Sequence, residues 1–299
     1  MNRHRIPSLF GVAWLASSLL AQASTLPERT DAVVDQVLMP AWVERQGVRQ
    51  PLSPGLALRN HDRVITGSDA RVRIDLADGS VLGLGADTHL ELNALGVRER
   101  HVFTAALDVP RGALRFSTAA AVRHHQQRAV NLRVGSITAG VRGTDLWGSA
   151  DSEQDRLCLL EGSITVLHPQ AEAQEISEVP SCYRANTGAA PAAVESATAQ
   201  QVAVWVTQTA LQIGSGQASR DGRWVVELAT LDSEAAALSL YDQARAAGYA
   251  ARIKPLAVAG GGYHYSVRIA QLATEIDAAT LAARIAQLLP VSTPFVARR

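Results

Sequence analysis

The sequence predicts a multidomain protein in which an all-β domain, either a sandwich or a β-solenoid, is followed by a small α+β domain of order βαββαβ. Two patterns predict this class. Short runs of alternating apolar and polar residues, separated by turn signals, fill residues 51–168. An internal repeat with a 41-residue offset occupies residues 223–297. At 299 residues, the chain is long enough for about two domains.

The first 23 residues have the pattern of a secretory signal peptide. Arg3 and Arg5 give a basic start, residues 6–20 are apolar, and Ala21-Gln22-Ala23 has the small-x-small pattern of a cleavage site. The apolar stretch is shorter than the ~20 residues that a membrane span needs, and no Cys follows it for lipid attachment. We therefore expect cleavage after about Ala23, no transmembrane anchor afterwards, and a periplasmic protein.

Charge and composition exclude a nucleic-acid partner. The chain has 28 basic and 28 acidic residues, and loss of the leader would remove two arginines, leaving a net charge of about −2. The 47% hydrophobic content is ordinary for a globular protein.

Residues 24–56 are predicted to be a lead-in, because Pro27, Pro40 and Pro51 interrupt the stretch. The β domain is expected over residues 57–188 and to finish with an edge strand. Asp78-Gly79 between two apolar runs predicts a hairpin. Glu161-Gly162 predicts a turn between two later strands.

Four short motifs follow one another in this β region, at residues 62–67, 76–80, 140–145 and 160–166. Together they resemble a FecR domain over residues 57–168. The most specific part is Arg142-Gly143-Thr144-Asp145, with Leu160-Glu161-Gly162-Ser163 about 15 residues further on. One departure is His61, which stands where the family usually has Gly before the first motif's Asp.

We interpret Arg142-Gly143-Thr144-Asp145 as a structural motif. Gly143 would supply a strained turn, Thr144 or Asp145 would accept local backbone hydrogen bonds, and Arg142 would pair with a carboxylate. FecR itself relays receptor occupancy to a sigma factor, which requires a cytoplasmic segment and a spanning helix that we do not expect here. The resemblance implies a periplasmic β module that serves as an interaction platform.

Cys158 and Cys182 are the two cysteines of the chain, an even number in a sequence with an export signal. We expect a disulfide between them, which would close a loop of roughly 25 residues and contribute about 3–4 kcal/mol. Two buried free thiols are the alternative.

Residues 189–222 are predicted to link the domains. The stretch 192–213 permits a helix with Val202, Val206 and Leu211 near one face, and the glycines at 214–216 then predict a flexible joint.

The internal repeat predicts the last domain, residues 223–299. Residues 224–231 and 265–272 have the pattern of the same strand, and each leads into a helix cap, at Ser233 and Thr274. We expect helices over 233–247 and 274–289, further strands over 249–255 and 293–297, and a turn at 260–262. The pattern resembles the SPOR domain, the sporulation-related repeat that binds glycan strands of peptidoglycan. Glu227, Ala229 and Ala270 replace the usual Gln and the two usual Gly.

Strand alternation predicts which residues occupy the sheet face opposite the helices, where the resemblance implies glycan binding. The polar candidates, which would offer hydrogen bonds to sugar hydroxyls, are Glu227, Arg252, Lys254, His264, Ser266 and Arg268. Alternatively, Glu227 and Arg268 form a solvated cross-strand ion pair worth at most about 1 kcal/mol.

Catalysis, metal binding and cofactor binding are not predicted. His124-His125 has no partner at metal-ligand spacing, and the sequence places no carboxylate pair in a recognisable site. RNA binding would need aromatic side chains on the open sheet face, whereas Tyr263 and Tyr265 share the parity of the apolar Val267.

Two hypotheses remain. In the first, the protein is a non-enzymatic periplasmic binder of peptidoglycan glycan strands, at division sites where glycan is denuded of peptides, and its FecR-like module contacts another envelope protein. In the second, it is an envelope signalling or scaffold adaptor that works through protein contacts without binding glycan.

Overall fold

The computed structural model describes residues 30–98, 102–118, 128–291 and 293–298, and the side chains of Arg98 and Arg142 lie outside the description. The predicted signal peptide and His124-His125 also lie outside the described residues. In the described part of the chain, no helix has the length and apolar character needed to cross a membrane.

The first part of the chain, which we call the β body (residues 31–196), contains two sheets. In the first sheet, β1 pairs with β6, β6 pairs with β7, and β7 pairs with the next strand of the sheet. Its shorter members are β1 (Ala32–Leu38), β4 (Ala57–Leu58), β6 (Arg71–Leu76), β7 (Ser80–Leu84), β14 (Ser181–Asn186) and β15 (Glu195–Ser196). The second sheet has as its shorter members β2 (Ala41–Arg45), β3 (Val48–Pro51), β5 (Arg63–Thr66), β8 (His89–Arg98), β10 (Arg128–Val134) and β13 (Ala171–Ile176).

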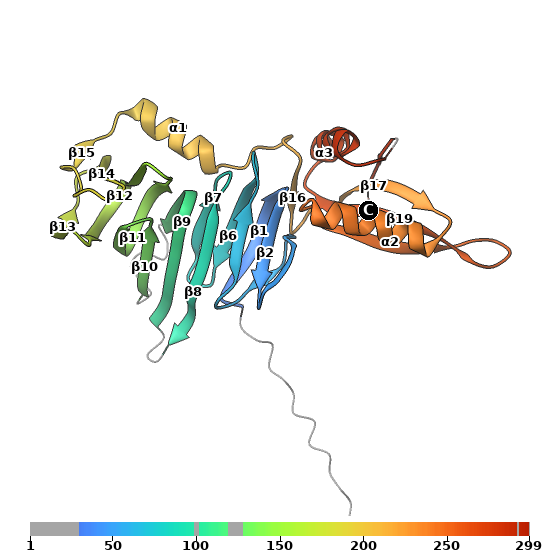
Figure 1. Cartoon of the computed structure of the whole chain (residues 1–299), viewed down its shortest axis with the longest axis horizontal. Helices are drawn as coiled ribbons and strands as arrows, with labels where there is room; N and C mark the ends of the chain where they lie inside the picture. Colours follow the sequence, from blue (N-terminus) through green and yellow to red (C-terminus); the bar gives the residue numbers. More distant parts are fainter. Residues whose placement is uncertain (1–29, 99–101, 119–127, 292, 299) are drawn as a thin grey trace, which may run out of the picture.

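Three long strands, β9 (Val102–Thr118), β11 (Ile137–Ala150) and β12 (Gln154–His168), run from one sheet into the other. Gly112, Gly143 and Gly162 stand near the crossings with φ of 98°, 65° and 91°, a backbone conformation that glycine adopts without strain. The predicted turn at Glu161-Gly162 is therefore wrong: β12 bends there and continues. The inner faces of both sheets bury one apolar cluster, so the fold is a sandwich whose sheets share strands (Figure 1).

The predicted lead-in is also wrong for residues 32–51, which form β1, β2 and β3. Val34, Val37 and Val43 are fully buried, and β1 pairs with β6 along most of its length. Proline interrupted the alternating pattern in the sequence, but Pro40 lies between β1 and β2 and Pro51 lies at the end of β3, positions where a missing N–H is tolerated.

The β body retains the local features that its motifs predicted. Asp78 accepts hydrogen bonds from the backbone N–H and hydroxyl of Ser80, and Gly79 has a φ of 80° in the hairpin between β6 and β7. His61 adopts a φ of 68°, so it keeps the left-handed backbone that glycine usually supplies. The buried carboxylate of Asp62 accepts two hydrogen bonds from Arg45, at 2.8 and 2.7 Å.

The C-terminal domain has the predicted order, with β17 (Trp224–Leu231), α2 (Glu234–Ala246), β18 (Ala251–Ala257), β19 (Tyr263–Leu272), α3 (Glu275–Leu288) and β20 (Phe295–Arg298). β19 lies between β18 and β17, and β20 pairs with the other edge of β17. Ser233 and Thr274 cap the two helices as predicted. Leu281 and Ile285 of α3 are fully buried in the core, whereas Leu288 near the end of the helix is 60% exposed.

The segment between the two parts begins with α1 (Ala199–Thr209), which is shorter than predicted. A capping box of Thr198 and Gln201 starts the helix seven residues later than expected from residue 192. Trp205 and Thr209 are its buried residues, and Val202 of the predicted apolar face is partly buried against the same cluster as Trp205, whereas Leu211 lies beyond the helix. Gly83 lets the helix approach the sheet, because a Cβ there would lie 3.2 Å from the carbonyl oxygen of Thr209.

Residues 214–219, which we call the joint, are held by many bonds, so the predicted flexible joint is wrong. One oxygen of the fully buried Asp277 carboxylate accepts the backbone N–H groups of Gly214, Gly216 and Gln217, at 2.9, 3.0 and 3.1 Å. Strand β16 (Gln217–Ser219) then pairs with β1 of the β body and with β19 of the C-terminal domain. The two parts therefore share hydrogen-bonded β structure (Figure 1).

Candidate glycan-binding face

The open face of the C-terminal sheet carries the predicted polar residues in rows across the strands. Glu227 pairs with Arg268, and Arg268 pairs with Arg252, so these three residues form one row. Ser266 pairs with both Thr230 and Lys254, which form the next row. Directly paired residues of an antiparallel sheet point to the same face, so the rows bring together the side chains that the alternating pattern grouped.

Glu227 organises the middle of this face, but not through an ion pair. Its carboxylate accepts hydrogen bonds from the hydroxyls of Ser266 at 2.6 Å and Thr230 at 2.8 Å. Among the described ion pairs there is none between Glu227 and Arg268, although the two are cross-strand neighbours. Ser266 is only 1% exposed, so its hydroxyl serves to fix Glu227 and is not available to a sugar, contrary to the sequence-based expectation.

Cationic donors lie on the same face of the sheet as this carboxylate. Arg252 and Lys254 lie exposed on the edge strand β18, and Arg268 is half-buried beside Glu227. His264 Nδ1 lies 2.7 Å from an oxygen of the exposed Asp232. The face therefore offers several N–H donors and one positioned carboxylate, the groups that bind sugar hydroxyls directionally.

The sequence-based reasoning missed Phe295, which extends the row from the other side. Phe295 pairs with Glu227 across β20 and β17, so its ring lies on the same face. It is 65% exposed, which is unusual for a large aromatic side chain that could be buried. An exposed ring beside hydrogen-bonding groups suits a ligand with both apolar and hydroxyl surfaces. The period-2 pattern of residues 293–297 contained this signal, but the strand is short and at the end of the chain.

The motif at residues 142–145 lies in the β body, away from this face, and its contacts differ from the expected ones. Asp145 accepts hydrogen bonds from the Arg115 guanidinium at 2.9 and 2.6 Å instead of from local backbone. These bonds raise the pKa of Arg115 above its ordinary value. The Thr144 hydroxyl is buried without a described hydrogen-bond partner. The predicted pairing of Arg142 lies outside the described side chains.

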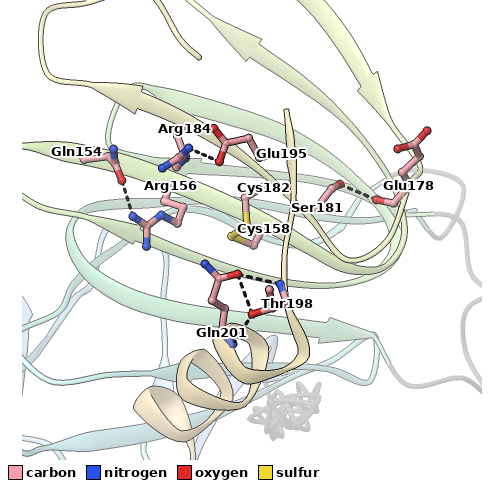
Figure 2. The surroundings of a disulfide bond; sticks show 10 residues. All are labelled: Gln154, Arg156, Cys158, Glu178, Ser181, Cys182, Arg184, Glu195, Thr198 and Gln201. Atoms are coloured by element: carbon pink, nitrogen blue, oxygen red, sulfur yellow. Dashed lines mark hydrogen bonds and ion pairs between the residues drawn. A yellow bond between two sulfur atoms is a disulfide. The ribbon is translucent and has the colours of Figure 1, made fainter. Parts of the chain in front are cut away.

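The predicted disulfide is confirmed. Cys158 and Cys182 are bonded across the adjacent strands β12 and β14 (Figure 2). Trp147 and Trp205 stack beside it with ring centroids 5.1 Å apart, and the four residues form a separate apolar cluster. Packing within this cluster holds α1 against the first sheet.

Comparison with known families decides which domains these two parts are. A family model described as FecR protein matches residues 62–165, and one described as SPOR domain matches residues 221–296. The chain carries a FecR domain followed by a SPOR domain. Both resemblances are thus confirmed, and the fold order of an all-β part followed by an α+β part agrees with them. Such domains are typical of cell-envelope proteins, and a SPOR domain indicates peptidoglycan binding.

No curated protein matches the chain. Two solved structures from Parabacteroides distasonis, at 1.65 and 2.50 Å resolution, are similar; both are provisionally described as an anti-sigma factor. Each has 14% identity and a TM-score of 0.40, and the matches cover 79% of this chain and 99% or 98% of the other.

In the described residues, no group of three His, Cys, Asp or Glu side chains is placed to hold a metal ion.

Proposed function

We propose that this protein is a non-enzymatic periplasmic protein that binds glycan strands of peptidoglycan through the open face of its SPOR domain. The single observation that carries the proposal is the row formed by Phe295, Glu227, Arg268 and Arg252. It combines an exposed ring, a fixed carboxylate and two guanidinium groups on one flat surface. A polysaccharide has alternating apolar ring faces and hydroxyl edges, and this row offers a partner for each.

In this proposal, the FecR domain is the interaction platform. The signal-peptide pattern of residues 1–23 supports export to the periplasm, and the disulfide between Cys158 and Cys182 suits an oxidising compartment. Because the joint is hydrogen-bonded to both domains, the FecR domain would keep a fixed orientation relative to a glycan bound on the SPOR face. In that orientation it would bind another envelope protein. Placement at division sites, where glycan is denuded of peptides, follows from the SPOR resemblance and is part of the proposal.

The direct test is retention of the mature protein on purified sacculi, with and without amidase pretreatment. We expect retention, and more of it after amidase has removed the peptides. No retention on either preparation would contradict glycan binding.

Two variants locate the site. Arg268→Ala and Phe295→Ala each remove one member of the row and should reduce retention several-fold, because each loses hydrogen bonds or contact area with the sugar. Arg298→Ala is a matched control. Arg298 is also an exposed residue of β20, but it is three positions from Phe295, so strand alternation places its side chain on the opposite face of the sheet. Unchanged retention of both row variants would place the glycan elsewhere.

One observation favours the second candidate function, an adaptor that does not bind glycan. Glu227 is already satisfied by two hydroxyl donors of its own chain, and Ser266 is buried. If the face is complete without a ligand, sacculi will not retain the protein, but a tagged copy will still localise with its envelope partner in cells.

A further inference from the structure

A groove of about 540 Å³ lies between the FecR and SPOR domains and shares only Arg252 with the proposed glycan row. Gln50 and Ser53 of the FecR domain line one side. The other side is formed by three residues of α2 and by residues 250–253 at the start of β18. The volume is in the range of roughly 300–1,000 Å³ that is usual for binding pockets.

The groove follows a free strand edge. Four consecutive residues, 250–253, line it. Three of them, Ala251, Arg252 and Ile253, belong to β18. Successive side chains of a strand point to opposite faces, so a cavity can touch these three in a row only by running along the strand's edge. β18 pairs with β19 on one side, and its other edge has no strand neighbour in the described structure. The open part of this edge is short, because Pro255 has no N–H to donate and the Ala251 N–H already donates to the carbonyl oxygen of Tyr249 at 2.7 Å.

The lining is cationic. It includes the guanidinium groups of Arg245 and Arg252 and no carboxylate. Neither arginine has a described ion-pair partner. The Arg245 guanidinium lies 5.1 Å from the centroid of the Tyr241 ring, which also lines the groove. Such stacking restricts the arginine while leaving its N–H groups free to bind an anion.

If a strand were added to the edge of β18, Arg245 and Arg252 would lie on opposite faces of it. Arg252 has the parity of the open sheet face, whereas Arg245 and Leu238 belong to the helix layer. Leu238 is 44% exposed in the groove, although it is a large apolar residue. A strand added to β18 would point alternate side chains to these two sides. Its best sequence would therefore carry an acidic residue for each arginine, at adjacent positions, and a leucine-like residue for Leu238.

We propose that this interdomain groove binds a short extended acidic segment of a partner protein, which adds as a strand to the free edge of β18. Main-chain hydrogen bonds would supply affinity, and Arg245, Arg252 and Leu238 would select the sequence. The peptides of peptidoglycan also carry carboxylates, but they contain residues of mixed chirality, which do not follow the alternation that the edge demands. The inference does not depend on glycan binding, because the groove and the open-face row share only Arg252, and Arg245, Leu238 and the strand edge lie outside the row.

The test uses a fluorescein-labelled peptide, Thr-Leu-Glu-Glu-Leu-Thr, whose sequence is the same in both directions, so either strand orientation presents the same groups. Fluorescence anisotropy with the full mature protein should show saturable binding. NMR should show shifts confined to the amides of the residues that line the groove, which are residues 250–253, those of α2, and Gln50, Ser53 and Leu56. The Gln-Gln version of the peptide should bind at least tenfold more weakly. A version with N-methyl groups at alternate amides should not bind, because it cannot add as a strand.

Charge reversal gives the decisive comparison. Arg245→Glu together with Arg252→Glu should abolish binding of the acidic peptide and create binding of the Lys-Lys peptide. Arg298→Glu, on the opposite edge of the sheet, should change neither. Thermal unfolding of each variant shows that it is folded.

Three results would overturn the proposal: equal binding of the N-methylated peptide, no binding of any peptide at millimolar concentration, or binding of a soluble peptidoglycan stem peptide in its place. Since none of these measurements uses sacculi, failure here is distinguishable from failure of glycan binding.

Discussion

The segment between the domains is fastened at two places by different chemistry. At α1, Trp205 stacks on Trp147 beside the disulfide that joins β12 to β14, so apolar contact holds the helix against two cross-linked strands. At the joint, one buried carboxylate, that of Asp277, accepts three backbone N–H groups. Apolar contact is spread over many atoms and is lost gradually, whereas the carboxylate either satisfies its donors or leaves them all unpaired.

The largest effect should come from Asp277→Ala. Removal of the carboxylate leaves the N–H groups of Gly214, Gly216 and Gln217 without their acceptor, so we expect a loss of about 4 kcal/mol in the free energy of unfolding. Urea unfolding measures it. Glu275→Ala is the control, because Glu275 is an exposed acid in the same helix turn. A loss below about 1 kcal/mol for Asp277→Ala would show that water replaces the carboxylate and that the joint is not a buried polar centre.

Removal of the disulfide should have the next largest effect. The Cys158→Ala, Cys182→Ala double variant frees a loop with 24 residues of sequence separation, and we expect it to lose about 3 kcal/mol. Thermal unfolding with and without reductant measures this. The double variant should be insensitive to reductant, and equal sensitivity of both proteins would contradict the assignment.

Trp205→Ala should cost about 2 kcal/mol, less than a typical core aromatic, because α1 is able to detach without unfolding the sheets. Hydrogen exchange should speed up in residues 199–209 and stay slow in β9 and β11. Val204→Ala is the matched control, since Val204 is 53% exposed on the same helix. Uniformly faster exchange throughout the FecR domain would instead make α1 part of its core.

The smallest effect concerns the ionic contact across the joint. The Arg220 guanidinium donates to Asp35 at 2.9 Å and to Asp75 at 3.0 Å, and the bond to Asp35 raises the pKa of Arg220. All three side chains are partly exposed, so Arg220→Ala should cost less than about 1 kcal/mol and the loss should shrink in high salt. A salt-independent loss of several kcal/mol would mean that Arg220 acts through packing.

The sequence correctly predicted the features that depend on interactions between residues close together in the chain. The hairpin at Asp78-Gly79 and the caps at Ser233 and Thr274 depend on residues within three positions, and all were confirmed. The repeat predicted which residues of β17 face the helices only as far as Leu228, because a bulge between Glu227 and Ala229 pairs Ala229 with the buried Val267.

Features that depend on distant partners were not predictable. Asp277 has the spacing of a cap residue, but its other partners lie 60 to 63 residues away. β1 was not expected because its pairing strands, β6 and β16, come much later in the chain. The glycine bends made each of the long strands resemble two short ones. On the open face, no pattern in the sequence indicated that the Ser266 hydroxyl donates to Glu227, because the two residues are 39 positions apart.

The pairing of β16 with β1 has a consequence for where the FecR domain ends. β1 pairs with β6 on one side, and on the other side its residues Gln36–Leu38 are completed by β16, about 180 positions later in the chain. A fragment that stops before residue 217 would leave those backbone groups uncovered, and an uncovered strand edge promotes aggregation. The first sheet is therefore completed by β16, which directly precedes the SPOR domain in the chain. We expect the two domains to be produced, purified and inherited as one unit.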